Sequence, residues 1–139
     1  MARSAISVLV VDDFDPFRQF LSSSLQSTSE RFVCWEAADG LEAVHKAEEL
    51  QPDLILLDIG LPKLNGIRAA RQISTASPKS KILFVSQESS ADVVREAFRV
   101  GAWGYIVKTD AASELPTALK AVLGGTRFVA SRFAGFEFA

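Results

Sequence analysis

The sequence is poor in the residues that build several common kinds of site. It has one cysteine and one histidine among 139 residues, so an internal disulfide is excluded and a zinc centre is disfavoured. The net charge is −2 and like charges form no long block, which argues against a general nucleic-acid-binding surface. The glycine patterns G-x-G-x-x-G and G-x-x-x-x-G-K-[ST] are also missing, which weakens a nucleotide-binding interpretation.

Long hydrophobic runs are absent too. The first apolar run, residues 6–11, ends in two aspartates and is too short for a secretion signal or a membrane span. Cys34 has apolar neighbours, which predicts a buried thiol and suits a reducing compartment. We therefore expect a cytoplasmic protein without a membrane segment.

Short apolar runs alternate with amphipathic segments along most of the chain. The runs at residues 6–11, 31–38, 54–57, 81–85 and 105–107 predict strands, and each is followed by a segment with helical periodicity. Strict alternation of this kind predicts a doubly wound α/β fold with a five-stranded parallel sheet. We expect one domain over residues 1–125, followed by a tail, residues 126–139, that holds four of the ten phenylalanines.

Two helix starts carry recognisable capping residues. Asp39, with Glu42 three positions later, matches a capping box at the start of the second helix. Asp110 is the expected cap of the last helix, which Gly124 and Gly125 should end.

Chargeable or reactive residues follow four of the five predicted strands. They are Asp12 and Asp13, then Asp58, Ser86 and Lys108. In open α/β sheets, ligands bind outside the carboxyl ends of the strands, so the fold should bring these residues to one rim. Each has an ordinary structural explanation when taken alone, as a helix start, a turn or a solvated charge. Their coincidence at one rim favours a functional site.

Three crowded carboxylates predict a bound cation. Two unit charges about 4 Å apart repel by roughly 4 kcal/mol at an effective dielectric near 20. Oxygen ligands at an open, partly hydrated site favour Mg²⁺. Mg²⁺ beside a carboxylate, a hydroxyl and a lysine suits phosphoryl transfer, in which a carboxylate can accept the group as an acyl phosphate.

Four short stretches carry a family resemblance when they are taken in order. They are LVVDD (9–13), LILLDIGLPKLNG (54–66), ILFVS (82–86) and GAWGYIVK (101–108). Over about residues 5–125 the chain resembles the CheY-like receiver domains of two-component response regulators. The stretch YIVKTDAASELPTALKAVLGG (105–125) is similar to receivers that precede LuxR-type helix-turn-helix output domains. The resemblance implies a flavodoxin-like (βα)5 fold with strand order 2-1-3-4-5.

The resemblance also implies a role for each rim residue. Asp58 would be the phosphoacceptor for a sensor histidine kinase, with Lys108 and Ser86 contacting the phosphoryl group. Mg²⁺ would be held by Asp13 directly, Asp12 through water, Asp58 and the backbone carbonyl of Gly60.

The same resemblance implies a switch and an output. Phosphorylation would draw Ser86 inward, and Tyr105 would turn from solvent into the vacated space. The surface of the fourth helix, fifth strand and fifth helix would then meet a downstream protein or an output domain absent from this chain. The chain itself would catalyse only its own phosphorylation and slow dephosphorylation.

Some features leave alternatives open. Gln87 stands where the family usually has a small residue, and Glu88 adds a charge close by, while Gly60 adds no side chain. These three positions could tune how long the phosphoryl group survives, and Gln87 leaves room for a phosphorylation-independent pseudo-receiver. A nucleotide- or flavin-binding module is a further alternative. The apolar fourth helix could support a homodimer, or the Phe-rich tail could cover that face.

Overall fold

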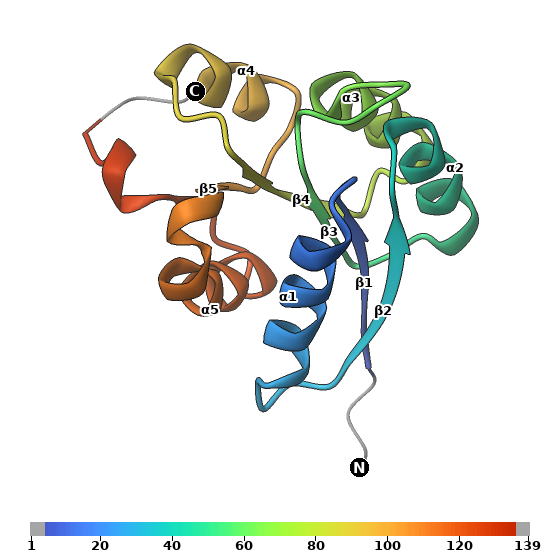
Figure 1. Ribbon diagram of the computed structural model, residues 1–139, viewed down its shortest axis with the longest axis horizontal. Coiled ribbons are helices and arrows are strands. Elements are labelled where there is room, and N and C mark those ends of the chain that lie inside the picture. Colours follow the sequence, from blue (N-terminus) through green and yellow to red (C-terminus); the bar gives the residue numbers. More distant parts are fainter. Residues whose placement is uncertain (1–4, 136–139) are drawn as a thin grey trace.

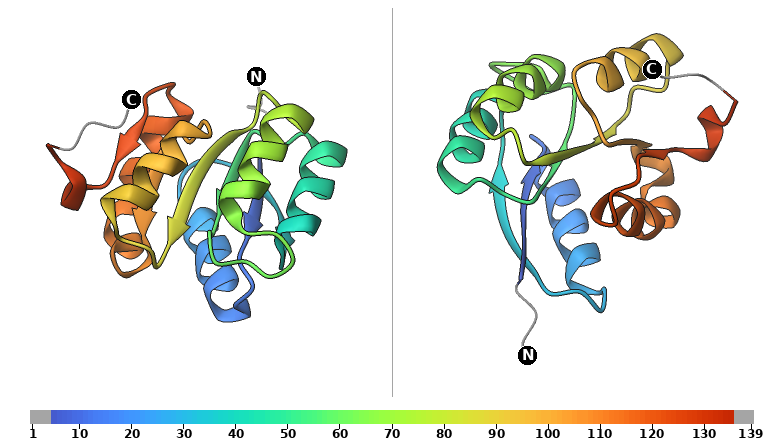
Figure 2. Two further views of the ribbon diagram at one scale, coloured as in Figure 1. Left: turned by 90° about the horizontal axis from the view of Figure 1, so that it is seen from above. Right: turned by 180° about the vertical axis from the view of Figure 1, so that it is seen from behind.

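A parallel sheet with helices on both faces forms the centre of the molecule (Figure 1). The computed structural model describes residues 5–135. Its helices are α1 (Asp15–Gln26), α2 (Gly40–Leu50), α3 (Gly66–Ala76), α4 (Ala91–Arg99) and α5 (Ala111–Leu123). Its strands are β1 (Ile6–Val11), β2 (Phe32–Ala37), β3 (Leu54–Leu57), β4 (Lys81–Ser86), β5 (Gly104–Val107) and β6 (Phe128–Val129). Figure 2 shows the helical layers from above and from behind.

The strand order is β2-β1-β3-β4-β5-β6, and all neighbouring strands pair in parallel. The predicted order 2-1-3-4-5 is confirmed for the first five strands. The predicted number of five strands was wrong, because β6 pairs with β5 through Gly104 opposite Phe128 and Tyr105 opposite Val129. The flavodoxin-like arrangement is otherwise as expected.

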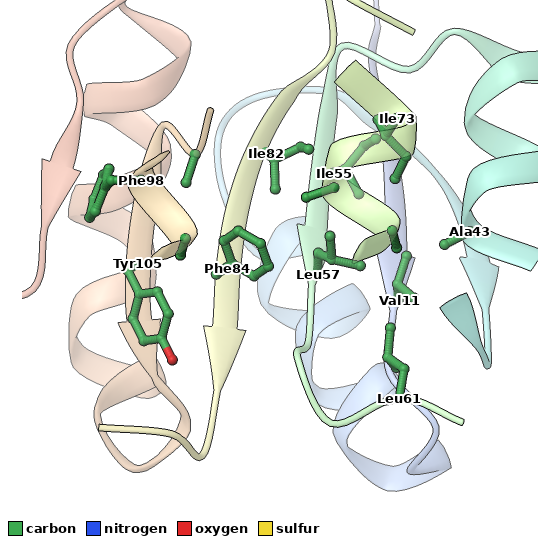
Figure 3. Packing of buried hydrophobic residues seen from close by; sticks show 14 of the residues in the cluster. Val11, Ala43, Ile55, Leu57, Leu61, Ile73, Ile82, Phe84, Phe98 and Tyr105 are labelled. Carbon is green, nitrogen blue, oxygen red and sulfur yellow. The ribbon is translucent and has the colours of Figure 1, made fainter. Parts of the chain in front are cut away.

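Successive strand residues supply two separate cores. In β1, Leu9 and Val11 face the cluster under α2, α3 and α4, whereas Val8 and Val10 face the cluster under α1 and α5. All four side chains are buried, as expected for a strand covered on both faces. Figure 3 shows the first of these cores, where side chains from β1, β3, β4 and β5 pack against the helices.

The two predicted helix caps had different outcomes. Asp39 accepts a hydrogen bond from the backbone N–H of Glu42, as predicted. Asp110 stands at the start of α5 but makes no side-chain cap, so that prediction was wrong. Its carboxylate instead accepts a hydrogen bond from Arg132, Nε to Oδ2 at 2.8 Å.

The tail returns to the domain over its described part. Beyond β6 a short 3₁₀ turn (Ser131–Phe133) buries Phe133, and Ala130 is also buried. Phe136 and Phe138, which also belonged to the predicted tail, lie outside the described residues. Within residues 5–135, no helix is long and apolar enough to cross a membrane.

Candidate phosphorylation site

Three carboxylates meet at the carboxyl ends of β1 and β3. One oxygen from each of Asp12, Asp13 and Asp58 can be chosen so that all three lie within 4.8 Å of one another. Asp12 is fully buried and Asp58 nearly so, while Asp13 is exposed. The order β2-β1-β3 places β1 and β3 side by side, which joins residues far apart in the sequence.

Lys108 joins two of these carboxylates. Its Nζ lies 2.7 Å from Asp12 Oδ2 and 3.0 Å from Asp58 Oδ2. It donates a well-aligned hydrogen bond to Asp58, whereas the approach to Asp12 is a close ion pair without hydrogen-bond alignment. The side chain reaches this position from the end of β5, two strands away from β3.

The pKa values of Asp12 and Lys108 follow from burial and charge together. Burial raises the pKa of Asp12 above its ordinary value of 3.8, and the like charge of Asp58 adds to this, although Lys108 and the N–H of Phe14 oppose it. Burial alone would lower the pKa of Lys108, but its two carboxylate partners outweigh burial and raise it. Asp12 therefore carries its negative charge at a cost that Lys108 offsets only in part.

This donor set fits a hard divalent cation. The oxygens come from three carboxylates. Gly60 lies on the same rim, where a Cβ added to it would have no neighbour within 4 Å. Asp12 Oδ2 is buried and accepts no aligned hydrogen bond from any residue in 5–135. A metal ion, or a water molecule bound to the metal, would give this buried oxygen a stabilising partner.

The loop after β3 is held by a close backbone approach. The N–H of Gly66 donates to the carbonyl of Ile59 at 2.8 Å. A Cβ on Gly66 would lie 2.0 Å from the carbonyl oxygen of Asp58, so only glycine fits here. Asn65 then caps α3 by accepting from the N–H of Arg68. The Asn65-Gly66 pair in the sequence thus fixes the backbone under the candidate acceptor.

Two supporting residues were missed by the sequence analysis. Arg18 donates to the backbone carbonyl of Asp12 at 2.7 Å and also pairs with Glu36 and Asp15. The ring of Phe17 lies 4.7 Å from Lys108 Nζ, a cation–π distance. Both residues are on α1, and the helical periodicity that predicted α1 gave no sign of these contacts.

Ser86 and Tyr105 lie in the buried part of the rim. Ser86 is 1% exposed, and its Oγ accepts from the N–H of Glu88 at 3.3 Å. Tyr105 is 0% exposed and donates from its hydroxyl to the carbonyl of Glu88 at 2.8 Å. The expectation that Tyr105 faces solvent before phosphorylation was therefore wrong. Burial raises the pKa of Tyr105, while a hydrogen bond with Ser86 opposes that rise.

An open depression of about 660 Å³ connects the site to solvent. Its lining includes Asp13, Asp58, Gly60, Ser86 and Lys108. Gln87 and Glu88 are exposed at its edge and do not fill it. Most of the expected site residues thus surround one accessible volume, whereas Asp12 and Tyr105 do not line it.

Comparison with known proteins identifies the chain. Residues 8–120 match the family model described as the response regulator receiver domain. The chain belongs to this family. As a receiver domain of a two-component response regulator, it has a signalling role in which phosphorylation is general to the family.

Similar regulators come from several bacteria. The chain is 35% identical over 130 residues to the transcriptional regulatory protein LiaR of Bacillus subtilis, covering 94% of this chain and 62% of LiaR. It is 37% identical over 115 residues to the response regulator protein VraR of Staphylococcus aureus, covering 83% and 55% of the two chains. The chain therefore spans about half to three-fifths of the length of these relatives.

A solved structure supports the same assignment. A LuxR-family two-component response regulator from Aurantimonas sp. SI85-9A1 superposes with a TM-score of 0.87 at 30% identity, over 94% of both chains. The similarity to receivers of LuxR-type regulators that the sequence predicted is confirmed.

Proposed function

We propose that Asp58 accepts a phosphoryl group from a sensor histidine kinase, in the cytoplasm, with Mg²⁺ bound at the rim. The observation that carries this proposal is the placement of Lys108 between Asp12 and Asp58 beside an open depression. The ammonium group of a lysine held there can shift its interaction from the carboxylate to the oxygens of an incoming phosphoryl group.

The proposed transfer uses Asp58 as a nucleophile. One Asp58 oxygen attacks phosphorus as the bond from phosphorus to the kinase histidine nitrogen breaks, and the bonding electrons leave with the imidazole. When bound, Mg²⁺ would neutralise phosphoryl oxygens and would be held by Asp13, by Asp12 through water, by Asp58 and by the Gly60 carbonyl.

Other residues of the chain hold and orient the group. The N–H of Ile59 donates to Asp58 Oδ1 at 2.7 Å, which fixes the carboxylate before the reaction. Lys108 would move its charge toward the phosphoryl oxygens, and the Ser86 hydroxyl would donate to one of them. Water would later cleave the acyl phosphate slowly, so the chain would act on itself and on no separate substrate.

The output would be a protein contact at the α4–β5–α5 face. We propose that this face meets a downstream protein or an output domain, and that it can also support a homodimer. The relatives named as transcriptional regulators are longer than this chain and support an output of that kind. With a net charge of −2, the chain itself is not proposed to bind nucleic acid.

Intact-mass measurement tests the phosphorylation chemistry. Incubation with acetyl phosphate and Mg²⁺ should add about 80 Da, one phosphoryl group. The gain should require Mg²⁺ and disappear in Asp58→Asn. It should persist in Asp53→Asn, whose carboxylate is exposed and bonds Ser7 at the opposite end of β3.

The alternative is a phosphorylation-independent pseudo-receiver. It would be favoured if the folded chain gave no adduct, and a Gln87→Ala variant would then distinguish a closed site from an inert one. Adduct formation restored by Gln87→Ala would assign the block to the glutamine side chain at the edge of the depression.

A further inference from the structure

The tail contains a segment that is built into the receiver. Residues 126–135, here called the clasp, lie beyond β5 at the edge of the sheet (Figure 1). Phe128 donates its N–H to the carbonyl of Trp103 at 2.8 Å. Gly104 permits this approach, because a Cβ there would lie 3.1 Å from the carbonyl oxygen of Phe128 and 2.7 Å from Leu83.

Polar contacts fix the register of the clasp along α5. Ser131 donates from its N–H and its hydroxyl to Glu114 Oε2, at 3.0 and 3.1 Å. Arg132 pairs with Asp110 at 2.7 Å and also donates toward Thr109. These groups are partly solvated, so we assign them to positioning more than to stability.

The clasp makes an apolar contact with Tyr105. Phe133 is 4% exposed, and its ring meets the Tyr105 ring edge-on with centroids 6.1 Å apart. Tyr105 also packs beside Phe84, and Figure 3 shows its hydroxyl pointing toward the carboxyl ends of the strands. Phe133 thus packs directly against Tyr105 at the β5 edge.

Two chains of contacts run from the clasp to the phosphorylation site. One passes from Phe133 to Tyr105 and, through the Tyr105 hydroxyl, to the Glu88 carbonyl, while the N–H of Glu88 contacts Ser86. The other passes from Arg132 to Asp110, which ends the 3₁₀ turn that begins at Lys108. The clasp therefore supports both segments that carry the phosphoryl-binding side chains.

We propose that the clasp holds Tyr105 buried before phosphorylation, and that its docking and the phosphorylation of Asp58 favour each other. The coupling to phosphorylation rests on the proposed function. A docked clasp orders the segments that carry Ser86 and Lys108. Phosphorylation of Asp58 then has a smaller entropic cost, because these segments are already ordered. Coupling of this kind is reciprocal: phosphorylation then stabilises the docked clasp.

The first experiment tests the hold on Tyr105. Because the chain has one tyrosine, incorporation of 3-fluorotyrosine gives a single fluorine resonance for Tyr105. In Phe133→Ala, the solvent isotope shift of this resonance should grow toward the value of free fluorotyrosine. In Val129→Ala, whose side chain is on the clasp but 38% exposed, it should stay as in the parent chain.

A second variant separates this effect from loss of fold. Arg132→Gln removes the ion pair with Asp110 but keeps the side chains of Phe133 and Tyr105. It should also increase the isotope shift, though less than Phe133→Ala. An unchanged resonance in both variants, with native circular dichroism, would overturn the hold on Tyr105.

The second experiment tests the coupling. Hydrogen exchange is measured over residues 128–133 before and after treatment with acetyl phosphate and Mg²⁺, with intact mass recorded on the same sample. Exchange should slow by about fivefold or more in the phosphorylated chain, the lower end of typical coupling. It should not slow in Asp58→Asn.

The possible failures are distinguishable. An adduct with unchanged or faster exchange in the clasp would overturn the coupling and leave the proposed function standing. Absence of any adduct would overturn the proposed function and the coupling together, while the fluorine measurement would still decide whether the clasp holds Tyr105.

Discussion

The Nζ atom of Lys108 lies 3.0 Å from Oδ2 of Asp58, although fifty positions separate the two residues in the sequence. The parallel order β1-β3-β4-β5 makes this contact possible, since it brings the carboxyl ends of these strands to one edge. The same lysine contacts Asp12, so a single cation stabilises two buried carboxylates.

Replacing Lys108 should affect both stability and phosphorylation. In Lys108→Met, Asp12 and Asp58 lose their shared cation, and we expect the free energy of unfolding at pH 7 to fall by about 2 kcal/mol without metal. Added Mg²⁺ should restore much of this loss. Phosphorylation by acetyl phosphate should slow by about a hundredfold. Urea unfolding with and without Mg²⁺, and the rate of adduct formation, measure the two effects. Equal stability of variant and parent without Mg²⁺ would contradict the account.

Neutralising Asp12 should have the opposite effect on stability. Its folded-state pKa is raised, so the folded chain binds more protons than the unfolded chain as pH rises from 3.8 through the folded-state pKa. The contribution of Asp12 to the free energy of unfolding therefore falls with pH across that window and stays lower above it. Asp12→Asn should remove this fall and be more stable than the parent at pH 7 without metal. It should also bind Mg²⁺ more weakly. Unfolding curves from pH 3 to 7 test this, and a steeper fall in the variant would refute it.

Gly60, in the loop after β3, and Gly66, the first residue of α3, should respond differently to alanine. Gly66→Ala would place a Cβ against the Asp58 carbonyl, and we expect a loss of about 3 kcal/mol or more in the free energy of unfolding. Gly60→Ala has open space and keeps its backbone carbonyl, so stability should change by less than about 0.5 kcal/mol. Mg²⁺ binding should survive in Gly60→Ala. Similar losses of stability in both variants would show that the close approach to the Asp58 carbonyl is not the reason why position 66 requires glycine.

Arg18 should matter for the acidic loop even though it touches no phosphoryl group. Arg18→Gln removes a charged hydrogen bond to the Asp12 carbonyl, and we expect a loss of about 1–2 kcal/mol in the free energy of unfolding. Mg²⁺ affinity should fall as the loop loosens. Arg68→Gln, an exposed change on α3, is the control and should leave both quantities unchanged. Calorimetric titration measures the Mg²⁺ affinity. An unchanged affinity in Arg18→Gln would mean that Arg18 only stabilises the fold.

Much of the fold could be predicted because the local signals agreed. Continuous apolar runs marked the strands, and Asp39 with Glu42 marked the start of α2. The sixth strand could not be predicted in this way, because β6 has only two residues and no periodicity. Its pairing depends on the edge of β5, and Gly104 allows the close approach there. Asp110 failed as a cap for a similar reason, since its partner Arg132 comes from the tail.

The site was predictable as a set of residues more than as a geometry. The fold class alone brought Asp12, Asp58 and Lys108 to the same rim, so their meeting was expected. The contacts of Arg18 and Phe17 could not be predicted. They depend on the length and rotamer of each side chain, which the spacing of residues along α1 does not determine. The contact of Tyr105 with Phe133 was likewise not predictable, because Phe133 comes from the tail, where the sequence shows little periodicity.

The most direct test of the central claim is to locate the phosphoryl group by chemistry. After reaction with acetyl phosphate and Mg²⁺, borohydride reduces an acyl phosphate to an alcohol and leaves free carboxylates unchanged. Tandem mass spectrometry of the tryptic peptide 47–63 should then find homoserine at position 58 and unchanged aspartate at position 53. Homoserine at position 12 or 13 in the tryptic peptide 4–18, with aspartate retained at 58, would contradict the assignment of Asp58 as the acceptor.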